Sequence, residues 1–136
     1  MKNTKTLIGG SALVKLGSSR STNDTDYLIN DINSKEAFIC DEKNNIDYLN
    51  ANGNKFFKEI FEIEKGNEIA SPQSLLELKA YAFVQHCQNF NWAKVNDCEF
   101  DMKFLSIKFN LKSVKIVNKY VSAGELAEIK KIITKY

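Results

Sequence analysis

The sequence has few of the residues that many enzymes use for catalysis. It contains one histidine, His86, one proline, Pro72, and one arginine, Arg20, so its other basic residues are all lysines. With a single histidine, a histidine-based zinc site and a Ser-His-Asp triad both lack the residues that they usually require. Any chemistry is therefore expected to depend on carboxylates, glycine turns and lysine or arginine.

Cysteines, long apolar runs and excess charge are also scarce. Cys40, Cys87 and Cys98 show no Cys-x-x-Cys spacing. An odd number of cysteines without a disulfide framework predicts reduced thiols and a cytoplasmic protein. No apolar run approaches the roughly 18 residues of a membrane-spanning helix, so we expect no membrane partner. The net charge of +2 is too small to predict a large electrostatic surface for nucleic acid.

The length and composition predict one globular domain over residues 1–136. The chain is 43% hydrophobic and 26% charged, which is ordinary for a domain with a real core. Short apolar runs come first and helical patterns follow, so we expect an α+β fold with a small mixed sheet packed against helices. The sheet-rich part is predicted at residues 1–70 and the helical part at 71–136.

The first half contains several short runs of strand character. Residues 41–45, DEKNN, form a turn signal between the last two runs, which predicts a hairpin. The segment 55–64 is ambiguous, and its pattern is compatible with a helix that turns into a strand. A short helix is expected at 11–16, with Gly17 at its exit. The predicted strands are residues 5–8, 25–30, 36–40 and 46–49.

The second half has helical periodicity. Ser71-Pro72 is a good helix start, because proline at the first helical position needs no amide partner, and this helix is expected to end near Gln88. Another helix begins near Trp92, and two short helices are predicted at 114–121 and 125–133. The apolar stripe expected to face the core of the helix after Trp92 consists of Val95, Cys98, Met102, Leu105 and Phe109.

Two aspartates one residue apart form the main candidate for a catalytic centre. In a strand, residues i and i+2 point to the same face, so Asp24 and Asp26 would hold two carboxylates side by side. Such carboxylates repel each other unless a cation lies between them, and Mg²⁺ is commonly held by one or two carboxylates plus substrate phosphates. Asp47 is the best candidate for a third carboxylate on a neighbouring strand.

A glycine turn and the single arginine suggest how phosphate would be held. Gly9 and Gly10 allow close backbone approach, and together with Ser11 they open a helix whose first amides face an anion. Arg20 adds a forked guanidinium that lysine cannot imitate. Neither a Walker phosphate loop nor a Gly-x-Gly-x-x-Gly motif is present.

These residues together resemble a known signature. The segment GGSALVKLGSSRSTNDTDYLI is similar to that of the nucleotidyltransferase superfamily, whose fold is shared with DNA polymerase β, and most of all to its small branch that includes AbiEii-type toxins. That branch has Gly-Gly-x-Ala-Leu, then a glycine, Arg-x-Thr/Ser and Asp-x-Asp. The matching residues here are Gly9, Gly10, Ala12, Leu13, Gly17, Arg20, Thr22, Asp24 and Asp26.

The resemblance continues to about residue 105. The family's third acid, in an apolar-Asp-x-Leu pattern, corresponds to Asp47 in residues 46–49. Its Ala-Ser-Pro-x-x-Leu-x-x-Leu-Lys helix corresponds to residues 70–79, and its later Lys-x-x-Asp-x-x-Asp element to residues 94–105, with Asp97 and Asp101. We interpret Asp97 and Asp101 as solvent-exposed or structural.

The resemblance implies an enzyme and its cofactor. Two Mg²⁺ ions, with Mn²⁺ as an alternative, would be bound by Asp24, Asp26 and Asp47, and Asp47 would help to deprotonate the attacking hydroxyl. Nucleoside monophosphate would pass from a nucleoside triphosphate to a hydroxyl of RNA such as a tRNA end, a protein or a small molecule. A homo-oligomer or a protein partner such as an antitoxin is a further expectation. The nucleotide-binding residues would be Gly9, Gly10, Ser11, Arg20, Thr22 and Lys79.

Other interpretations remain open. Taken alone, Asp24 and Asp26 fit a solvated loop, and Lys79 fits a solvated helix face equally well. Thr25 stands where the family has an apolar residue, and little of the chain precedes the first strand. These features are compatible with a catalytically weak or inactive relative that binds nucleotide or a protein partner. A nucleic-acid-binding domain is a weaker interpretation, because basic and aromatic residues are not clustered in the sequence.

Overall fold

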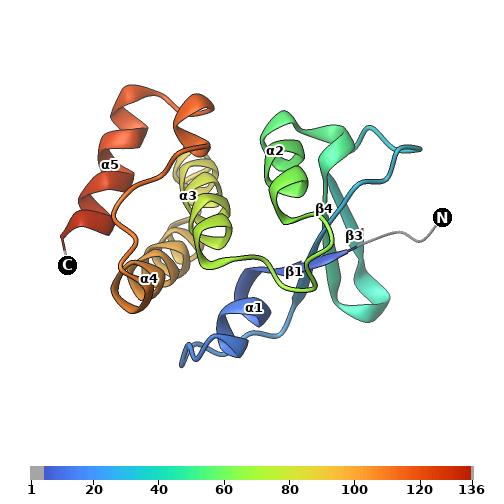
Figure 1. Cartoon of the computed structure of the whole chain (residues 1–136), viewed down its shortest axis with the longest axis horizontal. Helices are drawn as coiled ribbons and strands as arrows, with labels where there is room; N and C mark the ends of the chain where they lie inside the picture. The colour runs from blue at the N-terminus through green and yellow to red at the C-terminus, as the bar shows by residue number, and fades with distance from the viewer. Residues whose placement is uncertain (1–4, 136) are drawn as a thin grey trace. The chain divides into compact units, whose positions relative to one another are not determined.

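The computed structural model describes residues 5–135 of the chain, and the fold is α+β (Figure 1). The chain divides between Ser71 and Pro72 into two compact units. The first unit, here the sheet unit, holds the described strands and two α-helices. The second, here the helical unit, holds three α-helices within residues 72–135.

The sheet unit contains a mixed four-stranded sheet. In space the strands follow the order β1-β2-β4-β3. β2 pairs antiparallel with β1 and parallel with β4, and β3 and β4 form an antiparallel hairpin. The predicted strands and the predicted hairpin are thus confirmed, with Asn45 in the left-handed conformation at the turn. The strands are β1 Thr6–Ile8, β2 Thr25–Ile29, β3 Phe38–Asp41 and β4 Ile46–Asn50.

Two helices complete the sheet unit, α1 (Gly9–Lys15), which follows directly from β1, and α2 (Lys55–Glu64) (Figure 1). α2 is helical throughout, so the interpretation with a strand at its end is wrong. Asn54 caps it by accepting a hydrogen bond from the Phe57 amide at 3.0 Å, and its apolar side chains recur at helical spacing. Its buried residues are Phe56, Phe57, Ile60, Phe61 and Glu64.

α2 packs on one face of the sheet. The ring of Phe57 meets the ring of Phe38 in an edge-to-face contact with centroids 5.5 Å apart. Phe38 shares a row across the sheet with Leu49 and with the fully buried Leu28. Full burial of a leucine side chain, as at Leu28, contributes about 1.5–3 kcal/mol. This row therefore anchors the helix to the sheet.

The helical unit is built from α3 (Pro72–Gln88), α4 (Trp92–Phe109) and α5 (Ala123–Thr134). The predicted starts at Pro72 and Trp92 are confirmed. The predicted stripe of α4 is buried from Val95 to Leu105, while Phe109 is half-buried. α5 begins with a capping box in which Ser122 and Glu125 each bind the other's backbone amide. Within residues 5–135, no helix combines the length and apolar character needed to cross a membrane.

The helix predicted at 114–121 is wrong, since only a single 3-10 turn, η3 (Val117–Lys119), forms there. The cause lies in α3, where the fully buried Glu77 accepts the amides of Lys115, Ile116 and Val117 at 2.7, 3.2 and 2.9 Å. These amides bind the carboxylate, so they are not used in a regular helix. The segment also contains several β-branched residues, which have low helix propensity.

Candidate functional site

Two of the predicted aspartates are direct neighbours across the sheet. Asp26 of β2 is the register partner of Asp47 of β4 in the parallel pair, and both side chains are half-buried. Register partners on neighbouring strands point to the same face, about 4.8 Å apart along the hydrogen-bonding direction. Ile8 and Cys40 complete this row on the outer strands. The row lies on the face that α2 covers, two residues before the Leu28 row, so the carboxylates are not sealed in the core.

Gly9 lies directly against the Asp26 carboxylate. A β-carbon added to Gly9 would be 2.1 Å from Asp26 Oδ2, which is far inside van der Waals contact. Gly9 also has φ +68°, a left-handed conformation that side-chain-bearing residues rarely adopt. Both the backbone and the space therefore require glycine here, and the absence of a side chain brings the main chain of α1 against a carboxylate.

Gly10 likewise allows the side chains of Arg20 and Thr22 to approach the main chain closely. A β-carbon on Gly10 would be 2.8 Å from Arg20 Nη2 and 3.0 Å from Thr22 Oγ1. The guanidinium and the hydroxyl thus lie over the start of α1. The structure brings together five of the predicted site residues at the ends of β1 and β2, namely Gly9, Gly10, Arg20, Thr22 and Asp26.

Ser11 and Asp24 have a different arrangement from the predicted one. Asp24 is exposed and lies one residue before β2, so it is outside the registered pairs, which begin at Thr25. Its carbonyl oxygen accepts hydrogen bonds from Ser11 Oγ at 2.9 Å and Thr22 Oγ1 at 3.1 Å. In this structure both hydroxyls hold the loop before β2 against α1.

Cys40 is a neighbour of the site that the sequence analysis did not select. It is exposed on β3 opposite Asp47 in the hairpin register. Hydrogen bonding toward Asp47 is the largest cause that raises the pKa of Cys40, followed by burial and by the charge of Asp47. The hairpin register around Asn45 was the signal that could have identified it, because it places Cys40 opposite Asp47.

The fit of this row to a divalent metal can be judged from its donors. Among residues 5–135, no three His, Cys, Asp or Glu side chains are grouped so that they could hold a metal ion. The register does pair the carboxylates of Asp26 and Asp47. Two carboxylates fit Mg²⁺ in sites where substrate phosphates and water complete the octahedron. The residues present therefore fit a metal that arrives with a phosphate ligand, rather than a protein cage.

Lys79, the remaining predicted residue, belongs to the helical unit. Its ammonium makes an ion pair of 2.9 Å with Asp101, whose side chain is fully buried and not solvent-exposed. Burial, followed by the charges of Lys94 and Lys79, lowers the pKa of the nearby His86. A role for Lys79 toward a triphosphate stays a prediction.

Comparisons of the chain with protein-family models, curated proteins and solved structures gave no match. The functional argument for this chain therefore depends on the residues of the sheet unit.

Proposed function

We propose that the protein is a Mg²⁺-dependent nucleotidyltransferase that moves a nucleoside monophosphate from a nucleoside triphosphate to a hydroxyl acceptor. The observation that carries the proposal is the pairing of Asp26 with Asp47 in register, with Gly9 against the Asp26 carboxylate. Like charges placed side by side are unfavourable unless a cation separates them. A glycine against one of them lets the main chain at the start of α1 approach the same point.

The proposed roles follow the positions of the side chains. Asp26 and Asp47 hold Mg²⁺, which when bound neutralises charge on the triphosphate. The main chain of Gly9 and Gly10 approaches the phosphates, and Arg20 beside Gly10 donates to their oxygens. Asp47 also accepts the proton of the attacking hydroxyl, and pyrophosphate leaves as the bond between the α- and β-phosphates breaks.

The other predicted residues have supporting roles. Asp24 is exposed at the entrance of β2, where it contributes charge for the metal as the triphosphate binds. Ser11 and Thr22 hold the loop between α1 and β2 in place through the Asp24 carbonyl oxygen. In this arrangement most of the rate acceleration comes from positioning the reactants and stabilising charge.

Transfer of label from each α-labelled nucleoside triphosphate tests the proposal. The protein is incubated with Mg²⁺ and a pool of total RNA and protein extract, beside an Asp26→Asn/Asp47→Asn variant and a Glu62→Gln variant, which changes an exposed carboxylate of α2. We expect label on one acceptor class with the unmodified protein and with Glu62→Gln, and none with the double variant. Equal labelling by all three proteins would refute the proposal.

A second function has one observation in its favour. Because no group of three potential ligands is arranged for a metal within residues 5–135, a module that binds nucleotide or a protein partner without catalysis also fits. The two functions differ in metal dependence. For the enzyme, Mg²⁺ with triphosphate at ~100 times its dissociation constant adds about 2.7 kcal/mol to stability, which a thermal shift detects. A non-catalytic partner module shows no such dependence on Mg²⁺.

A further inference from the structure

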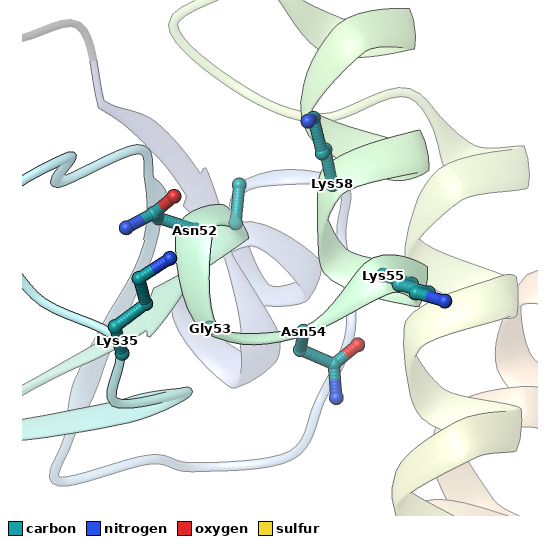
Figure 2. Close-up of a pocket in the computed structure, with 7 residues that line it drawn as sticks. Lys35, Asn52, Gly53, Asn54, Lys55 and Lys58 are labelled. Atoms are coloured by element: carbon teal, nitrogen blue, oxygen red, sulfur yellow. The ribbon is translucent and has the colours of Figure 1, made fainter.

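A basic pocket lies in the sheet unit at the end of β4, away from the aspartate row. Its volume is about 370 Å³, within the range of small-molecule sites. The 3-10 turn η2 (Ala51–Gly53) lies between Lys35 on one side and the start of α2 on the other (Figure 2). The lining residues are Lys35, Ala51, Asn52, Gly53, Asn54, Lys55 and Lys58.

The wall that carries Lys35 is fixed by hydrogen bonds. Asn50 is fully buried, and its amide group donates to the carbonyls of Ser34 at 3.2 Å and Glu36 at 3.0 Å while accepting from the Asp31 amide at 2.8 Å. Asn52 donates to the Ser34 carbonyl at 2.6 Å. The loop before β3 is therefore held in one conformation although it lacks regular structure.

The η2 turn is packed equally closely against the same loop. A β-carbon on Gly53 would be 2.5 Å from the Ala37 amide nitrogen and 2.6 Å from the Glu36 carbonyl oxygen, so only glycine fits. On the other side of the turn, Asn54 caps α2 and thereby sets the direction of its first residues. The backbone of the pocket is thus fixed by the fold, and exposed lysine side chains complete its lining.

The charge of this pocket is not compensated. Lys35, Lys55 and Lys58 are exposed, and no carboxylate lines the pocket. Within residues 5–135, none of the three makes an ion pair with an acidic side chain. The three lysines line one cavity, and their charges together favour an anion there. The positive end of the α2 dipole adds to the same preference.

We propose that this pocket binds a phosphate-bearing anion at a site separate from the aspartate row. Lysine is a compact point charge with three rotatable donors, which suits the tetrahedral oxygens of phosphate, and the two asparagines leave the floor polar. The pocket lies four residues along β4 from Asp47, or about 13 Å at the rise of a strand. The ligand is either free phosphate, such as pyrophosphate, or the backbone of single-stranded RNA. The proposal does not depend on the proposed catalysis.

The test is a titration followed by amide chemical shifts of the full chain, in EDTA so that metal binding does not contribute. The probes are inorganic pyrophosphate and a ten-nucleotide oligouridylate. We expect saturable shifts at residues 35 and 51–58. Lys35→Gln/Lys58→Gln should weaken binding at least about tenfold, because two of the three charges that hold the anion are gone. The matched control is Lys65→Gln, an exposed lysine at the other end of α2.

The outcomes separate the sources of the phosphate. Saturation at lower concentration by the oligouridylate assigns the pocket to a nucleic-acid backbone, and the reverse order assigns it to free phosphate. Asp26→Asn/Asp47→Asn should bind both probes as the unmodified protein does, which separates this site from the aspartate row. Shifts that do not saturate, or that are equal in Lys35→Gln/Lys58→Gln and Lys65→Gln, show only general screening by surface charge and would overturn the proposal.

Discussion

The two units of the protein hold their carboxylates in opposite ways. In the helical unit, Glu77 and Asp101 are fully buried, and each has partners for its charge, namely three backbone amides and Gln73 for Glu77 and the Lys79 ammonium for Asp101. In the sheet unit, Asp26 and Asp47 are half-buried and lie next to each other in register. The first two carboxylates are fully buried among their partners, whereas the second two are partly exposed and lie in register on neighbouring strands.

This difference separates carboxylates that maintain the fold from carboxylates that are available to a ligand. A buried carboxylate with complete hydrogen bonding stabilises one conformation and has little capacity left for another cation. Two neighbouring carboxylates that remain partly exposed can still accept a cation, which reduces the repulsion between them. Burial therefore favours the sheet unit as the place of the proposed chemistry, in agreement with the position of Gly9 against Asp26.

The largest effect on stability is expected at Glu77. Each of its carboxylate oxygens accepts two donors, so Glu77→Gln leaves two donors facing an amide nitrogen. Loss of an acceptor costs about 1–3 kcal/mol for each buried donor, and we expect the free energy of unfolding to fall by about 2–4 kcal/mol. Urea denaturation measures it. Glu128→Gln, in an exposed ion pair with Lys131, should change it by less than about 0.5 kcal/mol. A similar fall in the free energy of unfolding for both variants would show that the buried hydrogen bonds of Glu77 add no more stability than an exposed ion pair.

The aspartate row should respond in the opposite direction. Asp47→Asn removes one of two like charges that lie in register, so the free energy of unfolding should stay unchanged or rise by about 0.2–1 kcal/mol. Nucleotidyl transfer should fall at least ~100-fold, the size typical of losing a group that stabilises transition-state charge. Urea denaturation and label transfer measure the two effects. A stability loss as large as that of Glu77→Gln would mean that Asp47 is structural.

Substitution of Gly9 tests whether its close approach to Asp26 contributes to stability. Gly9→Ala should lower stability by about 1–3 kcal/mol, because the left-handed conformation costs roughly 1–2 kcal/mol with a side chain and the methyl group displaces the carboxylate. Gly124, in the first turn of α5, has nothing within 4 Å of an added β-carbon. Gly124→Ala should therefore be neutral or stabilising by up to about 1 kcal/mol. Thermal denaturation compares them, and equal effects would contradict the assigned contact.

The smallest expected effect is on the reactivity of the Cys40 thiol, which depends on the charge of Asp47. Since Asp47 raises the pKa of Cys40, Asp47→Asn should lower that pKa and increase the thiolate fraction at pH 8. Alkylation of Cys40 by iodoacetamide, followed by mass spectrometry, should become severalfold faster. Cys87 is the internal control, because burial and then Glu128, Glu125 and Glu99 raise its pKa. An unchanged alkylation rate of Cys40 would show that Asp47 does not raise the pKa of its thiol.

Local sequence signals were sufficient to predict most of the helices, strands and turns. Pro72 and Asn45 mark a helix start and a turn by their own backbone preferences, and both are where the sequence placed them. Residues 114–121 were mispredicted because the acceptor for their amides, Glu77, lies about 40 residues earlier in the chain. Periodicity within a short window does not contain such a contact.

The site shows the same division between local and long-range information. The glycines, Arg20 and Asp26 fall within one segment, and the structure brings them together. Neither the parallel pairing that sets Asp47 beside Asp26 nor the Cys40 contact follows from composition or periodicity. The side-by-side placement of Asp24 and Asp26 requires Asp24 in the strand, yet it precedes β2 by one residue, because strand boundaries are set by pairing with β4.

Broadening of amide resonances by substoichiometric Mn²⁺ tests most directly whether the sheet unit holds the cation. Mn²⁺ takes the same oxygen ligands as Mg²⁺, and its unpaired electrons broaden only the nuclei near its binding site. Broadening centred on residues 9, 26 and 47, and lost in Asp26→Asn/Asp47→Asn, is the expected result. Broadening that survives in the double variant, or no selective broadening at any concentration, would contradict the account.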